Sequence, residues 1–469
     1  MAAPRKRVEI ADVRFRAIRA YAGARGTTYT VRWTVAGRDH QRTFSTRKLA
    51  DVFRSELLVT ARAGRDFSRE SGMPREASAG TDPDVSWYSH ACEFVDYKWS
   101  HASPRHRKGL AEALTDVSLA LVDQAPKPRD VSALRHALYS WSFNARARAE
   151  PAPPELDSPL RWIEAHSLPL GQVGDARTLR AALDAISRKR DGSPAAASTI
   201  RRKRSALHSA LQFAVELEHF DTNPMHRVSW RPPQTTDAVD RRVVVNPEQA
   251  QTLLTAVGES MPAIEAFFAC LYFAGLRPSE AVNLRISDFQ LPDRGWGRLL
   301  LSGSYQVSGA AWTRSGTSGE EQALKHRATK DTRVVPVHPT LAATLARQIE
   351  TFGTGQGGRL FVTRTGKAGV PLSPPYSNPL AMNTVYRIWT RARKSALSPE
   401  QFSSPLARRP YDLRHACLST WLNAGVPATQ VAEWAGHSVN VLLRVYATCI
   451  DGEHEAALSR IEAALTRFE

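Results

Sequence analysis

The sequence lacks the features of several protein classes. No apolar run approaches the roughly 18 residues that cross a bilayer, and the first residues, MAAPRKRVEIADVRFR, contain no apolar stretch typical of a secretory signal. The four cysteines (Cys92, Cys270, Cys417, Cys449) form neither a CxxC pair nor a zinc-ligand pattern. These absences predict a protein of the reducing cytoplasm, without a membrane segment or a structural metal.

Motifs of common enzyme chemistries are missing as well, since there is no P-loop, no GxSxG and no carboxylate pair with metal spacing. Acidic residues are also fewer than basic ones: the chain has 63 Lys and Arg and 46 Asp and Glu, which gives a net charge of +17. Such a surplus attracts polyanions, and the many arginines suit phosphate oxygens. A codon bias towards Ala and Arg could explain the number of arginines, but not the imbalance of sign.

The 469 residues, 42% of them apolar, predict a multidomain globular protein. We expect three units, at 1–67, 85–231 and 245–469. A Gly/Ser/Pro-rich linker at 68–84 and a second linker at 232–244 separate them.

The first unit is predicted to be a small sheet with one helix. Residues 29–35 alternate like a half-buried strand, 36–39 suit a hairpin turn, and 40–44 form the returning strand. A helix over 46–64 follows, which Thr46 can cap. Its outward arginines suggest that this unit lies on DNA, with a protein-docking module as the alternative.

The second unit is predicted to be all-helical, from the apolar spacing in 87–99 and 198–220, with an irregular Pro-rich interruption at 145–159. Ser198 is a candidate N-cap. The helix that it would begin carries a basic cluster, which is a DNA-binding candidate or a solvated charged face: Arg201, Arg202, Lys203 and Arg204.

The third unit begins with a helix over 246–257, with Asn246 as its cap and Pro247 as its first residue. Arg277 then stands at a helix junction, in LYFAGLRPSEAVNLRISDF, with Glu280 close enough to brace it. A strand around Lys325 and another at 333–337 predict a hairpin that projects a lysine into a cleft.

Three further stretches complete the set of candidate residues. Tyr411, Arg414 and His415 lie within one turn of a helix in RRPYDLRHACLSTWLNAG. Gly436 breaks a short helix and presents His437, and the apolar stretch NVLLRVYATCI holds Tyr446.

Together these residue types suit phosphoryl chemistry. Two arginines and a histidine can bind the oxygens of a phosphodiester in its transition state, and a tyrosine can act as a covalent nucleophile. A free phenol has a pKa near 10, so at pH 7 about one tyrosine in a thousand is ionised, a deficit of roughly 4 kcal/mol that nearby arginines can reduce. Lys325 could protonate the leaving 5′-oxygen.

This ordered series resembles the catalytic domain of the tyrosine recombinases, the phage-integrase family. The motifs GLRPSE, YDLR and Gly-His carry the resemblance. The family's first arginine matches Arg277, and the acidic residue that follows it matches Glu280. The hairpin lysine matches Lys325, and the second arginine matches Arg414. The histidine of the Gly-His motif matches His437, and the nucleophile matches Tyr446. The stretches LKHR and YDLRH further resemble integrases of actinobacterial phages and integrative plasmids.

Two departures leave alternatives open. Tyr411 stands where the family commonly has histidine, so the base that deprotonates Tyr446 could be His437, water or a substrate oxygen. The segment 302–324 is longer than the minimal family connection, and its Gly and Ser content predicts a flexible excursion. Lys330 therefore remains a rival to Lys325.

The resemblance implies a multidomain α+β fold. It consists of a small N-terminal β-sheet-plus-helix arm-binding domain, an all-α core-binding domain, and a mostly α catalytic domain with a small β-sheet. It implies a site-specific recombinase that needs no metal or other cofactor and joins strands through a 3′-phosphotyrosine and a Holliday junction. Integration or excision of a mobile element in a bacterial, nucleoid-associated setting would be its role.

The implied partners are double-stranded DNA, with core-type and arm-type sites, and three further copies of the chain in a homotetramer on that DNA. A host bending factor or an excision factor are further candidates. An apolar stripe in 451–469 could dock on a neighbouring subunit or on its own domain. The rival interpretations are a monomeric type IB topoisomerase and a non-catalytic DNA-binding protein.

Overall fold

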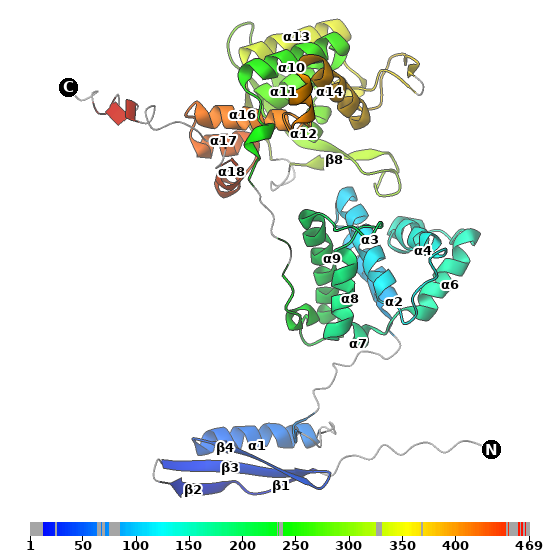
Figure 1. Ribbon diagram of the computed structural model, residues 1–469, viewed down its shortest axis with the longest axis vertical. Helices are drawn as coiled ribbons and strands as arrows, with labels where there is room; N and C mark the ends of the chain where they lie inside the picture. The colour runs from blue at the N-terminus through cyan, green and yellow to red at the C-terminus, as the bar shows by residue number, and fades with distance from the viewer. Residues whose placement is uncertain are drawn as a thin grey trace. The chain divides into compact units, whose positions relative to one another are not determined.

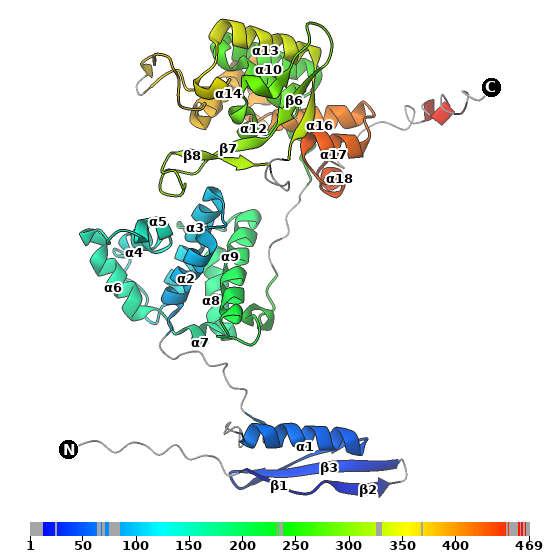
Figure 2. The same cartoon turned by 180° about the vertical axis from the view of Figure 1, so that it is seen from behind.

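The structure is a computed structural model. It describes residues 13–23, 26–62, 67, 71–74, 85–231, 233, 238–324, 331–366, 369–446, 449, 458–459, 461–462 and 465. The chain divides into two compact units: Met1–Tyr97 with Leu110–Pro232, and Lys98–Gly109 with Pro233–Glu469. Helices predominate, and the sheets are small (Figures 1 and 2). In the described part of the chain, no helix is both long and apolar enough to span a bilayer.

The N-terminal part is a four-stranded antiparallel sheet with one helix along it (Figure 1). The central strand β3 pairs with the other three; the elements are β1 (Val13–Phe15), β2 (Arg19–Gly23), β3 (Gly26–Val35), β4 (Arg38–Phe44) and α1 (Arg47–Arg62). Trp33 of β3 packs edge-on against Phe53 of α1, and Thr46 Oγ1 accepts from Leu49 N at 3.3 Å as a cap. The sheet-plus-helix prediction is confirmed, although β1 and β2 were not foreseen.

The helical region follows as predicted, from Trp87 to Glu216. Its α-helices are α2 (Trp87–Trp99), α3 (Pro104–Ala120), α4 (Val131–Ala137), α5 (Ala145–Arg148), α6 (Asp157–His166), α7 (Leu170–Val173), α8 (Ala176–Ile186) and α9 (Ala197–Glu216). Ile200, Leu207 and Leu211 form the buried stripe of α9, which is the amphipathic pattern that a helix needs to join a core.

Two local predictions in this region are wrong. Helix α9 has Ala196 as its N-cap, without a side-chain cap bond, so Ser198 lies inside the helix. The segment 145–159 is not irregular throughout: it contains α5, which Asn144 caps by accepting from Ala147 N at 3.2 Å, and the start of α6. A single polar cap is enough to begin a helix that the prolines nearby obscure.

The C-terminal region is a helical body with two small sheets (Figures 1 and 2). Its helices are α10 (Pro247–Ser260), α11 (Glu265–Phe273), α12 (Pro278–Asn283), α13 (Pro339–Phe352), α14 (Met382–Ala396), α15 (Pro399–Ser403), α16 (Asp412–Asn423), α17 (Ala428–Ala435) and α18 (Val439–Tyr446). The predicted start of α10 is confirmed, because Asn246 and Gln249 form a reciprocal capping box and Pro247 is the first helical residue. Phe268 of α11 stacks on Trp389 of α14 in the core.

The described strands on either side of Lys325 belong to two different sheets. One sheet contains β5 (Phe289–Gln290), β6 (Gly297–Leu301) and β9 (Arg333–Val337), and the other contains β7 (Gly303–Val307) and β8 (Gly319–Ala323). Strand β9 pairs with β6, with Leu299 opposite Val335, so it is not the partner of the strand that precedes it in sequence. Residues 325–330, which hold most of the predicted strand and turn around Lys325, lie outside the described residues.

The prediction of a flexible excursion at 302–324 is also wrong, because β7 and β8 form an antiparallel hairpin there. Its loop is closed by Thr313 Oγ1, which donates to Thr317 O at 2.7 Å, and by Ser308 N, which donates to Ser318 O at 3.1 Å. Polar residues that suggest flexibility in sequence instead satisfy backbone groups in the turn.

Part of the predicted linker 232–244 belongs to the C-terminal body. Val239 is buried in one cluster with Leu442 and Tyr446, and its N–H donates to Val445 O at 2.7 Å. The residues that lead into α10 are thus attached to α18, the helix that ends at Tyr446.

Candidate active site

A buried carboxylate gathers three arginines in the C-terminal unit. Both oxygens of Glu280, on α12, accept from Arg333: Nη1 to Oε1 at 3.0 Å and Nη2 to Oε2 at 2.7 Å. Arg277 Nη1 donates to Oε1 at 2.6 Å, and Arg414 Nη1 lies 4.0 Å from Oε2. We call these four residues the arginine cage.

The cage needs its carboxylate in the charged form. Glu280 is only 2% exposed; burial alone raises the pKa of such a carboxyl group, but Arg333, Arg277 and Arg414 outweigh burial and lower the pKa of Glu280 to about 2. A buried arginine without a counter-charge costs several kcal/mol. Glu280 therefore permits three guanidinium groups to remain close together at neutral pH.

Arg277 occupies the N-cap position of α12, directly after the turn at Gly275. Its own N–H donates to Glu280 Oε2 at 2.9 Å, and its Nη2 donates to Gly436 O at 2.9 Å. These bonds fix the direction of the guanidinium. Its side chain is 19% exposed, which makes it the accessible member of the cage.

Arg414 comes from the first turn of α16 and has no exposed surface. It donates through Nη1 to Gly275 O, and through Nη2 to Ala435 O at 2.7 Å and to His437 Nε2 at 3.1 Å. Its Nε has no hydrogen-bond partner among the residues that the structure describes. A buried donor without a partner is costly and is suited to a ligand oxygen.

His437 is presented by a left-handed residue, Gly436, at the end of α17 (φ 64°, ψ 48°). A side chain there would be strained, and its Cβ would lie 2.4 Å from Arg333 Nη1. Burial and the charges of Arg414, Arg277 and Arg333 lower the pKa of His437 to about 3. The ring is therefore neutral at physiological pH.

The tautomer of His437 follows from its partner. A guanidinium can only donate, so Nε2 accepts from Arg414 and Nδ1 carries the hydrogen. Within the described part of the chain, this Nδ1 has no hydrogen-bond partner. It is a second buried donor that is available to an anionic oxygen.

Tyr446 is the last residue of α18 and is fully buried. Its hydroxyl lies 2.9 Å from Nδ1 of His415, one residue after Arg414 on α16. Burial raises the pKa of the Tyr446 phenol, and Arg414 acts in the opposite direction. The tyrosine is thus protonated in this state and lies against the positive cage.

The structure brings five of the predicted residues into one site: Arg277, Glu280, Arg414, His437 and Tyr446. Tyr411 is the N-cap residue of α16, and its ring centroid lies 5.0 Å from that of His415. Lys325 and its rival Lys330 lie outside the described residues.

Sequence reasoning missed two members of the site. Arg333 was treated only as part of a strand, although a charged residue that starts an alternating strand with a buried face is a signal for a buried ion pair. His415 was placed in the right turn without a role. Their partners lie 53 and 31 residues away in sequence, so no local pattern shows the pairing.

The basic cluster of α9 has a different setting, in which Arg201 and Arg202 are exposed and Lys203 and Arg204 are half-buried. Arg202 forms an ion pair with Glu112 of α3 at 3.0 Å, with both side chains more than 40% exposed. Lys203 pairs with Asp116, and the Arg204 guanidinium lies 5.8 Å from the Trp230 ring centroid. Arg202 and Lys203 are therefore already paired with carboxylates in this structure.

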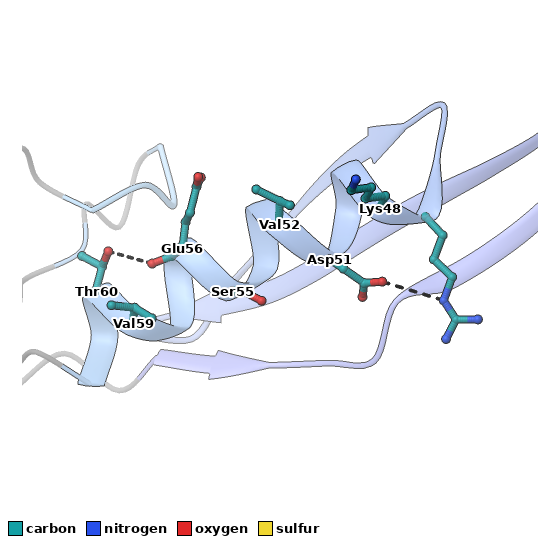
Figure 3. A pocket seen from close by; sticks show the side chains of 8 residues that line it. Lys48, Asp51, Val52, Ser55, Glu56, Val59 and Thr60 are labelled. Carbon is teal, nitrogen blue, oxygen red and sulfur yellow. Dashed lines mark hydrogen bonds and ion pairs between the residues drawn. The ribbon is translucent and has the colours of Figure 1, made fainter.

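A shallow hollow also runs along the outer face of α1 (Figure 3). Charges of both signs and exposed apolar side chains line it, among them Lys48, Glu56, Val52 and Val59. These residues do not converge on one point, so the hollow is not a competing site for phosphoryl chemistry.

Comparison with known families identifies the class. Residues 244–451 match the phage integrase family. These residues thus form a domain of the phage integrase family, the tyrosine recombinases, which are enzymes that cleave and rejoin DNA. No curated protein matches the chain.

Solved structures of recombinases are similar to the chain at low identity. The Tn1549 transposon integrase in complex with transposon right-end DNA is 16% identical, with a TM-score of 0.45, over 69% of this chain and 98% of that one. The XerH site-specific recombinase bound to difH is 15% identical, with a TM-score of 0.42, over 83% and 97%. A lambda integrase tetramer bound to a Holliday junction is 15% identical, with a TM-score of 0.42, over 93% and 96%.

Proposed function

We propose that Tyr446 is the nucleophile of a site-specific recombination reaction. Its oxygen attacks a DNA backbone phosphate, the bond to the 5′-oxygen breaks, and a 3′-phosphotyrosine and a free 5′-hydroxyl result. Attack by a 5′-hydroxyl of a second duplex then reverses the chemistry and joins new strands through a Holliday junction. The observation that carries this proposal is the convergence of Tyr446, Arg414 and His437 on one buried positive site.

The donors of the site suit the transition state of this reaction. Extra negative charge develops there on the phosphate's equatorial oxygens, and preorganised donors stabilise it without reorganisation. The Arg414 Nε and the His437 Nδ1, both buried donors without partners among the described residues, would bind these oxygens. Arg277, partly exposed, would contact the phosphate first.

DNA must open the site before cleavage. Arg414 and Tyr446 have no exposed surface in this state, so a phosphate reaches them only after the residues that cover them move. This is a resting arrangement with the nucleophile protonated and covered. Binding energy from the rest of the DNA would drive the opening.

The leaving 5′-oxygen needs a proton, because an alkoxide is a poor leaving group. Lys325 is our candidate for this general acid and Lys330 is its rival; an ammonium group on the chain between β8 and β9 can supply the proton. Tyr411 completes the proposed set at the start of α16, beside His415.

We assign the other parts of the chain to DNA contact. Residues 1–67 would bind arm-type sites, and 85–231, with Arg201 to Arg204, would bind the core-type site. Residues 245–469 would form the catalytic domain. Four copies on two duplexes would integrate or excise a mobile element in the bacterial nucleoid, and a host bending factor or an excision factor could assist them.

A suicide substrate tests the nucleophile. A nicked core-site duplex that loses its 5′-hydroxyl fragment on cleavage should trap a covalent protein–DNA adduct with the wild-type chain. Tyr446→Phe should form none, because it lacks the attacking oxygen. Tyr386→Phe changes an exposed tyrosine of α14 and should form the adduct at the wild-type rate. An adduct with Tyr446→Phe would refute the assignment.

A supercoiled plasmid that carries the core site, incubated with a partner duplex, separates recombination from relaxation. A recombinase joins strands of two sites, whereas a type IB topoisomerase relaxes supercoils and leaves the two duplexes separate. A relaxed plasmid without joined products would favour the topoisomerase.

A further inference from the structure

The proposed reaction needs an acceptor for the proton of Tyr446, and the structure places one base in contact with its hydroxyl. Oη of Tyr446 lies 2.9 Å from Nδ1 of His415. Within the described part of the chain this is the only hydrogen bond of the hydroxyl. A general base must lie within about 2.6–3.2 Å of the atom that it deprotonates, and His415 does.

We propose that His415 is the general base for Tyr446. The proposal rests on the proposed function, in which Tyr446 is the nucleophile. As the bond from Oη to phosphorus forms, the Oη–H bond breaks and its proton passes to Nδ1 of His415. The bond from phosphorus to the 5′-oxygen breaks, and that oxygen takes a proton from the general acid. In rejoining, the imidazolium returns its proton to Oη as the phosphotyrosine bond breaks.

Two other candidate bases of the site, Tyr411 and His437, are poorer acceptors. Tyr411 is itself a phenol, and its ring lies against His415 rather than bonding to Tyr446. In His437 the acceptor nitrogen is already occupied by Arg414. Residues 411 and 415 are one turn apart on the same side of α16, so a base at position 415 reaches the site from the same helix face.

The charges around His415 keep it unprotonated and ready to accept. Arg409 and Tyr411 face it from the residues that lead into α16, Arg414 is the preceding residue, and Tyr446 faces it from α18. Burial, followed by Arg409 and Arg414, lowers the pKa of His415 to about 4. A bound phosphodiester would bring negative charge beside Arg414, oppose its effect and make His415 more basic when attack occurs.

His415→Asn separates proton transfer from positioning. Asn Oδ1 can replace Nδ1 as the acceptor of the phenol's hydrogen bond, but an amide cannot take the proton. In single-turnover cleavage of the suicide substrate at pH 7, we expect a loss of about 100-fold, the usual contribution of a general base. The loss should shrink as the pH rises towards the pKa of the phenol, because phenolate then forms without a base. DNA affinity should not change.

Added imidazole supplies a second readout. His415→Ala opens a space beside Tyr446, and imidazole in the buffer should restore cleavage in proportion to its concentration. A structural role for His415 would give no such rescue. The Ala variant, together with His415→Gln, also keeps the test valid if the Asn variant does not fold.

His338→Asn is the matched control. His338 is also partly buried, and its Nδ1 also accepts a hydrogen bond, from Thr340 N at 3.2 Å, as the N-cap of α13. Asparagine is a good N-cap, so cleavage by this variant should equal that of the wild type at every pH.

The outcomes separate the two proposals. If the wild type forms an adduct that Tyr446→Phe abolishes, and the His415 variants cleave at the wild-type rate or faster, His415 only holds the resting tyrosine and the inference is overturned. A loss that stays the same at every pH, without imidazole rescue, also overturns it. If the wild type forms no adduct, the proposed function itself fails.

Discussion

Arginines lie in two contrasting environments in this chain, the arginine cage and the basic cluster of α9. In the cage, Arg333 and Arg414 are buried and share one carboxylate, Glu280, which is itself 2% exposed. In the cluster, Arg202 has its own carboxylate, Glu112, and both lie at the surface. Both pairs join an arginine to a glutamate, but water surrounds the pair on α9 and is excluded from the pairs in the cage.

The difference determines how each region responds to change. Water and salt screen the surface pairs, which contribute about 0–1 kcal/mol each. The cage has no such screening, so removal of one charge leaves others unpaired in a low-dielectric interior. Loss of one charge should therefore destabilise the whole cage, whereas loss of the exposed Arg202–Glu112 pair should have a small effect.

The largest effect should come from Glu280→Gln. The substitution leaves three guanidinium groups without their shared anion, and we expect a loss of about 3–5 kcal/mol in the free energy of unfolding at pH 7. Chemical denaturation measures it. Because the folded-state pKa of Glu280 is about 2 and the usual value is 4.5, its contribution is present above about pH 4.5 and is lost as the pH falls towards 2. The two proteins should converge in stability over that range.

Glu112→Gln is the matched control, since Glu112 forms an ion pair with Arg202 in which both side chains are more than 40% exposed. Its loss should stay below about 1 kcal/mol. Equal losses for the two variants would mean that the cage is no different from a surface pair.

Gly436→Ala should have the next largest effect. A Cβ at this position meets Arg333 Nη1 at 2.4 Å in addition to the strain of the left-handed backbone. We expect slower cleavage of the suicide substrate, by at least about 10-fold, since His437 follows directly and an ill-placed donor to the transition state costs catalysis.

Gly192→Ala isolates the backbone strain, because Gly192 also has a positive φ, of 81°, but nothing lies within 4 Å of its Cβ position. It should lose about 1–2 kcal/mol of stability and keep its cleavage rate. Wild-type cleavage by Gly436→Ala would show that the close packing behind His437 is unimportant.

The smallest effect should come from Arg201→Ala with Arg202→Ala on α9. If these side chains bind DNA phosphates, affinity should fall a few-fold for every DNA sequence alike. The slope of log affinity against log salt should decrease by about 0.9 for each phosphate that is no longer neutralised. Cleavage at saturating DNA should be unchanged. Binding titrations at several salt concentrations measure this, and an unchanged slope would identify a solvated charged face.

The residues of the cage differ in how well the sequence alone could predict them. Arg277, Arg414, His437 and Tyr446 occur in an order that can be recognised without knowing any contact, and Glu280 lies three residues after Arg277, within one turn of α12. Arg333 has no local cue to its partner, because Glu280 lies on a different element, 53 residues earlier, and only the folded chain brings the two side chains together.

The β-structure shows the same limit. Alternation predicted β3 and β4 because they form a local hairpin with Ala36 and Gly37 at its turn. The partner of β9 is β6, more than thirty residues earlier, and the alternation in 333–337 carries no information about that choice. Helices were predicted better, since the Asn246 capping box and the stripe of α9 depend on neighbours in sequence.

The bond between Val239 and Val445 has a practical consequence for dissecting the chain. The matched family domain begins at residue 244, and the sequence suggested a boundary at 245. A catalytic fragment cut at either point would lose Val239, and with it one wall of the packing around Leu442 and Tyr446. A fragment for expression should begin no later than residue 238. With a shorter fragment, a poor adduct yield would reflect the lost packing of Val239 near Tyr446 rather than the absence of a DNA-binding domain.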